Sequence, residues 1–195
     1  MWELKKIMNK KQIGVYGAVG AILLGLAAFA INVSTDDEES SSASHRFSLS
    51  DAANEAQEVF LYFTAGSQGM LVAEKRRVSD PENPVEFGQL IIRELIKGPA
   101  NRNLSATLPE DTTCRALYIT KNGTAYADFS SALKEKHPGG TEAEMLTIYS
   151  IVNSLALNLD KIQSVKLLLE GQEIKTLAGH IDLRRPFKAD MRMVQ

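Results

Sequence analysis

Cysteine is nearly absent from this sequence. Cys114 is the only one among 195 residues, so the chain has no internal disulfide. A zinc site built from several thiolates and a CxxC redox centre are excluded for the same reason. Because Cys114 falls in a predicted strand, we expect it to be a small buried apolar residue.

Signatures of common active sites are also missing. The phosphate-binding patterns GxGxxG and GxxxxGK[ST] do not occur, and residues 66–69 lack the spacing of the GxSxG of serine hydrolases. With 22 basic and 24 acidic residues, the chain has a formal net charge of −2 and lacks the basic excess typical of nucleic-acid-binding proteins. We therefore expect no cofactor, no metal and no nucleic-acid partner.

One long apolar run is present. Ile13 to Val33 contains no charged residue over 21 positions, and a helix of that length spans about 30 Å, the thickness of a bilayer core. Four lysines precede the run within residues 1–12, and four acidic residues follow at 36–39. The positive-inside rule then predicts a cytoplasmic segment at 1–12, a single-pass anchor at 13–33 in the cell inner membrane, and a periplasmic remainder.

A cleaved signal peptide is the alternative for this run. Ala28-Phe29-Ala30 fits the small-x-small rule for cleavage after Ala30. The apolar run is longer than the usual signal-peptide core of roughly 7–15 residues, which favours a retained anchor. No cysteine stands just after the run, which excludes a lipoprotein anchor. Residues 34–54 are polar, Ser-rich and acidic, and we interpret them as a flexible linker.

Residue periodicity predicts a folded domain at 55–187, followed by a tail at 188–195. Strands are predicted at 58–64, 70–78, 113–120, 124–130, 164–170 and 173–177, and helices at 85–97 and 141–159. The order ββαββαββ, with short turns between strands, predicts a two-layer α+β domain with a mainly antiparallel sheet and two helices on one face.

Asp128 and Glu144 are expected to have structural rather than catalytic roles. Asp128 alternates with the inward-facing Ala127 and Phe129, and we expect it to accept backbone N–H bonds that fix the loop at 130–140. Glu144 lies three residues after Thr141, a spacing that predicts a capping box at the start of the second helix.

Short motifs in a fixed order resemble the GerMN domain family. The residues that carry this resemblance are Tyr62-Phe63, Arg76, Gly98-Pro99, Leu108-Pro109, Asp128-Phe129-Ser130, Gly139-Gly140, Glu144 and Gly179-His180-Ile181-Asp182. The resemblance covers about residues 57–187. It implies a membrane-tethered extracytoplasmic module that acts in protein–protein assembly at the cell envelope, as in sporulation and germination complexes, with no established enzymatic activity.

Histidines and basic residues supply the remaining candidate sites. His45 lies in the linker, His137 lies in a loop, and the pair His180-x-Asp182 is only a weak metal-binding signal. Lys75 and Arg77 share one strand face and Arg76 takes the other. With Arg184 and Arg185, they form a basic set suited to an anionic polymer or to an acidic partner.

Three functions follow from these observations. The first is an assembly module that binds cell-envelope proteins or a second copy of itself. The second is a binder of envelope polymer or a small ligand, using the basic residues and the loop at 97–108. The third is a hydrolase built on Asp128, Glu144 and His180. We predict the first, with no enzymatic activity and no catalytic, cofactor-binding or metal-binding residue.

Overall fold

The computed structural model describes residues 56–66 and 69–195 of the chain. The predicted anchor at 13–33, the linker at 34–54 and His45 lie outside these residues. In the part that is described, no helix is long and apolar enough to cross a membrane.

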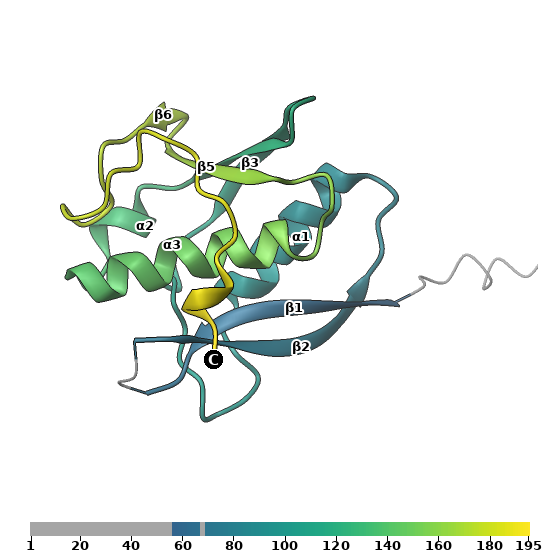
Figure 1. Cartoon of the computed structure of the whole chain (residues 1–195), viewed down its shortest axis with the longest axis horizontal. Helices are drawn as coiled ribbons and strands as arrows, with labels where there is room; N and C mark the ends of the chain where they lie inside the picture. The colour runs from purple at the N-terminus through teal and green to yellow at the C-terminus, as the bar shows by residue number, and fades with distance from the viewer. Residues whose placement is uncertain (1–55, 67–68) are drawn as a thin grey trace, which may run out of the picture. The chain divides into compact units, whose positions relative to one another are not determined.

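The described elements run from a β-hairpin to a short 3₁₀ helix (Figure 1). In order they are β1 (Ala56–Thr64), β2 (Leu71–Ser79), α1 (Pro84–Ile96), β3 (Cys114–Ile119), β4 (Thr124–Phe129), α2 (Ala132–Glu135), α3 (Thr141–Ala156), β5 (Ser164–Leu169), β6 (Gln172–Glu173) and η1 (Met191–Met193). The predicted order ββαββαββ is wrong in one respect, because the short helix α2 stands between β4 and α3.

The strands form two sheets. The β1–β2 hairpin is one sheet, and β3-β4-β5-β6 is the other. β4 and β5 are parallel, because the α3 crossover between them returns the chain in the same direction. The predicted single sheet is therefore wrong, whereas the expected mainly antiparallel pairing holds for three of the four strand pairs in the described residues.

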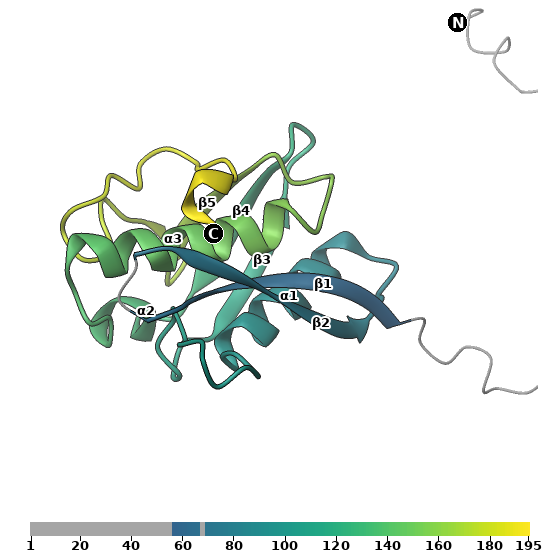
Figure 2. The ribbon, with the colours of Figure 1, turned by 60° about the horizontal axis from the view of Figure 1, so that its bottom comes forward.

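Helices α1 and α3 lie between the hairpin and the four-stranded sheet (Figures 1 and 2). Each helix contacts both sheets: α1 packs on β1 and β3, and α3 packs on β1 and β5. The prediction that both helices cover one face of a single sheet is therefore wrong. The physical reason is that α3 is apolar on more than one side. Its Leu146 joins Tyr62 and Leu71 of the hairpin, while Ile148 and Leu155 belong to the main core.

Close packing of α1 depends on one glycine. A Cβ placed on Gly88 would lie 2.4 Å from Leu117 Cδ2 of β3 and 3.5 Å from Leu155 Cδ2 of α3. Since the first of these distances is far inside van der Waals contact, the missing side chain lets α1 approach β3.

The outer edge of β1 is closed by Ser154 of α3 and by Asn158 in the turn that follows the helix. Asn158 Oδ1 accepts from the Phe60 amide at 2.9 Å, and Asn158 Nδ2 donates to the Phe60 carbonyl at 2.7 Å. Ser154 Oγ accepts from the Tyr62 amide at 3.2 Å. These bonds replace the missing neighbouring strand and attach the hairpin to the helix layer.

The chain's last residues return to the hairpin. The Gln195 amide donates to the Leu71 carbonyl at 3.0 Å, and Val194 forms a parallel bridge with Leu71. Met193 and Val194 pack against the buried side chains of Tyr62 and Leu71. The segment therefore covers the first part of β2.

Candidate functional site

Glu144 on α3 holds the loop before the C-terminal segment. Its side chain is fully buried and accepts hydrogen bonds from four backbone amides of residues 177–181, at 2.8 to 3.3 Å. His180 Nδ1 lies 3.2 Å from Glu144 Oε2. The predicted capping box is wrong: Gly140 is the N-cap of α3, and no side chain caps the helix there. The Glu144 carboxylate is needed instead by a loop more than 30 residues further along the chain.

The hydrogen bonds from the four amides determine the protonation state of Glu144. Burial acts to raise the pKa of the carboxyl, but the four amides that bind the charged form outweigh burial, and the pKa lies below its ordinary value. A carboxylate in this state is a poor general base, because it binds a proton weakly at neutral pH.

Asp128 lies in a separate cluster at the end of β4. Its Oδ1 accepts from the Gly171 amide at 2.8 Å, and its Oδ2 lies 3.3 Å from Arg115 Nη1. Arg115 also pairs with Glu170 at 3.0 Å. Asp128 therefore fixes the β5–β6 turn. The prediction that it accepts backbone N–H bonds is confirmed, but the predicted target at 130–140 is wrong, because pairing with β5 places Asp128 beside that turn.

The basic residues of β2 divide between the two faces as predicted. Arg76 is turned inward, where its guanidinium donates to the carbonyls of Glu94 and Gly98 at 3.0 Å each and pairs with the carboxylates of Glu74 and Glu94. Arg76 thus joins β2 to the end of α1. Lys75 and Arg77 are exposed on the opposite face.

The remaining basic candidates lie in the C-terminal segment. Arg184 forms a two-point ion pair with Asp182, with nitrogen–oxygen distances of 2.9 and 2.7 Å. Arg185 is exposed. Asp182 is already bound by Arg184 while His180 faces Glu144, so these two residues, the weak metal-binding signal of the sequence, do not converge on one point.

His137 is held by its own loop. Its Nδ1 accepts from the Gly139 amide at 3.0 Å, and its Nε2 lies 3.1 Å from Thr147 Oγ1. Burial is the largest influence and lowers the pKa of His137. Across residues 56–66 and 69–195, no group of three or more His, Cys, Asp or Glu side chains is placed to hold a metal ion.

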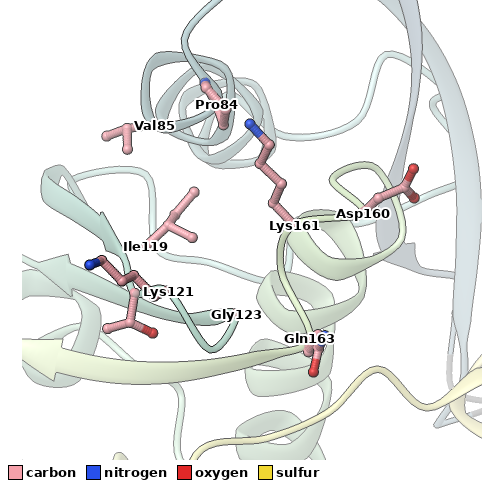
Figure 3. Close-up of a pocket in the computed structure, with 9 residues that line it drawn as sticks. Pro84, Val85, Ile119, Lys121, Gly123, Asp160, Lys161 and Gln163 are labelled. Carbon is pink, nitrogen blue, oxygen red and sulfur yellow. The ribbon is translucent and has the colours of Figure 1, made fainter.

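An open cleft of about 470 Å³ lies where α1 begins (Figure 3). Pro84 and Val85 of α1 and Ile119 of β3 form its apolar wall, and Lys121 and Lys161 stand at its rim. In Figure 3 the Lys161 side chain extends toward Pro84. Both lysines are exposed, so the cleft offers a shallow surface rather than an enclosed pocket.

Comparisons with known proteins identify the family. A family model described as "Germane: Sporulation and spore germination" matches residues 60–175. The chain belongs to this family. The resemblance to GerMN domains expected from the short motifs is confirmed.

Two solved structures are similar to this Germane domain. The first GerMN domain of the sporulation protein GerM from Bacillus subtilis has 25% sequence identity and a TM-score of 0.53, and the match covers 70% of this chain and 98% of that one. The tandem GerMN domains of GerM have 24% identity and a TM-score of 0.54, covering 68% of this chain and 46% of that one. A search of curated proteins gave no match.

Sequence reasoning missed two features of this Germane domain. One is the Arg76 network with Glu74 and Glu94. The other is the closure of the β1 edge by Ser154 and Asn158. The second had a signal in the sequence, because Ser154 and Asn158 are polar residues four positions apart, a spacing that places them on one face of the helix predicted at 141–159.

Proposed function

We propose that this chain is a membrane-tethered, extracytoplasmic Germane module that works by binding other proteins of the cell envelope rather than by catalysis. Membership of the sporulation and spore germination family is the observation that supports this most directly. The uncharged apolar run at 13–33 and the charges that flank it support the tether and its orientation.

The arrangement of the candidate catalytic groups supports a role without catalysis. Glu144 and His180 meet, but the Glu144 carboxylate is occupied by backbone amides with its pKa lowered. Asp128 belongs to the separate Arg115 cluster. A hydrolase needs a nucleophile and a base within hydrogen-bond reach, and these three residues do not supply that pair.

Site-specific photo-crosslinking in cells that produce the full chain tests this proposal. A photoreactive amino acid is placed singly at exposed positions on different elements: Lys75, Tyr118, Lys121, Leu157 and Met191. We expect discrete adducts of defined mass from one or more positions and none from the others. Monomer alone from every position, in cells where the family's process is active, would contradict an assembly role.

A further inference from the structure

The outer edge of β2 is an open strand edge. In β1, the backbone groups of Phe60, Tyr62 and Thr64 point away from β2, since they bond Asn158, Ser154 and Ser105. Two residues that lie directly opposite each other in an antiparallel pair either both point their N–H and C=O toward each other or both point them away. Their partners Leu71, Ala73 and Lys75, and Arg77 two residues further on, therefore turn N–H and C=O to the outer edge.

Only the beginning of this edge is covered. The Leu71 carbonyl accepts from Gln195. Beyond that point, the backbone groups of Ala73, Lys75 and Arg77 have no hydrogen-bond partner among the residues that the structure describes, and all three side chains are exposed. This gives three consecutive outward residues with a donor and an acceptor each.

The other strand edges of the described domain are protected. Ser154 of α3 and Asn158, just after that helix, close β1. A register shift between Cys114 and Ala116 interrupts β3, and β6 has two residues. Bulges and short edge strands are the usual means of preventing unwanted pairing. β2 has neither a bulge nor a short length, because its nine residues pair with β1 in unbroken register, and the charges of Lys75 and Arg77 are its protection against unselected strands.

Charge selects the kind of segment that this edge accepts. Lys75 and Arg77 lie along the open stretch, and the acid beside them on that face is Glu58, 2.7 Å from Lys75. A second copy pairing two-fold along β2 would place the same basic residues against each other, which is unfavourable. An extended segment with acidic residues at alternate positions would face them with the opposite charge.

We propose that the β2 edge from Ala73 to Arg77 binds an extended, acidic segment of a partner protein as an added strand. The inference rests on the proposed assembly function and names its surface. Main-chain hydrogen bonds supply affinity in this mode, and alternate side chains supply selectivity. Because the ionic contacts are exposed, binding should weaken as salt is added.

A peptide assay on the full chain in detergent micelles tests the edge. The probes are two labelled seven-residue peptides, one alternating Glu and Val and the other alternating Lys and Val. We expect the Glu peptide to bind at least about tenfold more tightly, the ratio that corresponds to roughly 1.4 kcal/mol. On its addition, amide exchange should slow at Ala73, Lys75 and Arg77. It should stay unchanged at Val72, Glu74 and Arg76, which already bond β1. Equal binding of both peptides, or binding of neither, would overturn the proposal.

Three variants locate the contact. Ala73→Pro removes an outward N–H without removing a bond to β1, and it should weaken binding of the Glu peptide about tenfold. Lys75→Glu/Arg77→Glu should reverse the preference between the two peptides, which keeps the test valid if the proline variant does not fold. Lys121→Glu/Lys161→Glu carries the same charge change at the cleft and should leave binding unchanged. Retained binding in both β2 variants, or loss in the cleft variant, would overturn the edge assignment.

The photo-crosslinking experiment distinguishes failure of the β2-edge proposal from failure of the proposed assembly role. With Ala73 and Arg77 added to the labelled positions, adducts from 73, 75 or 77 that map to an acidic extended segment would support the edge. Adducts from other elements with none from β2 would overturn the edge and leave the assembly role standing.

Discussion

Glu144 is the residue on which the C-terminal segment most depends. Replacing it by Gln leaves one oxygen to face four amides and adds an NH₂ group among donors. We expect Glu144→Gln to lower the free energy of unfolding by about 2–4 kcal/mol, measured by denaturant titration at pH 7. Glu142→Gln, at an exposed position two residues earlier on α3, should have almost no effect on the free energy of unfolding. Equal effects of the two substitutions would contradict the account.

The Glu144 carboxylate should also make the stability of the fold depend on pH. Its folded-state pKa is below the ordinary value of 4.5, so the stabilisation is complete above that value and is lost as pH falls through the folded-state pKa. Stability measured from pH 7 downwards should therefore fall more steeply in the natural chain than in Glu144→Gln. Parallel curves would show that Glu144 carries no such linkage.

The thiol of Cys114 should react slowly with thiol reagents. Burial is the main cause that raises its pKa to about 11, and the side chain is half-buried beside β4. Since the thiolate is the reactive form, we expect slow reaction with a disulfide reagent at pH 8 and faster reaction as pH rises toward 11. The unfolded chain at pH 8 is the control and should react rapidly with one equivalent. Rapid labelling of the folded chain at pH 8 would contradict this environment.

At the scale of elements, the attachment of the hairpin to the turn that follows α3 is testable. Asn158→Ala removes both side-chain bonds to the Phe60 backbone, and we expect the free energy of unfolding to fall by about 1–2 kcal/mol. Amide exchange at Phe60 should become faster, because its N–H loses its partner. Asn103→Ala, in an exposed loop, is the matched control. Unchanged exchange at Phe60 would show that Asn158 does not close this edge.

Local patterns predicted the elements better than their assembly. Alternation identified β4, where Ala125, Ala127 and Phe129 are buried. The pairing of β4 with β5 depends on where α3 packs, and no short pattern contains that information. The Thr141-x-x-Glu144 spacing fits a capping box, yet the partners of Glu144 lie 33 to 37 residues downstream. A buried carboxylate and a capping carboxylate have the same local sequence, so only the tertiary fold distinguishes them.

At the scale of the whole molecule, a Germane domain follows an anchor that the sequence predicts. The domain has an open basic strand edge at β2, and its carboxylates Asp128 and Glu144 hold loops in place. Those properties suit a module that meets partners at its surface. They serve that purpose only if the domain lies in the compartment where such partners are found.

Labelling of intact cells by a membrane-impermeant maleimide tests this placement most directly. The full chain carries Lys121→Cys, an exposed position, with Cys114→Ser to remove the natural thiol. The account predicts labelling in intact cells, to the same extent as after permeabilisation. Labelling that appears only after the membrane is opened would contradict an extracytoplasmic domain and, with it, the proposed role at the cell envelope.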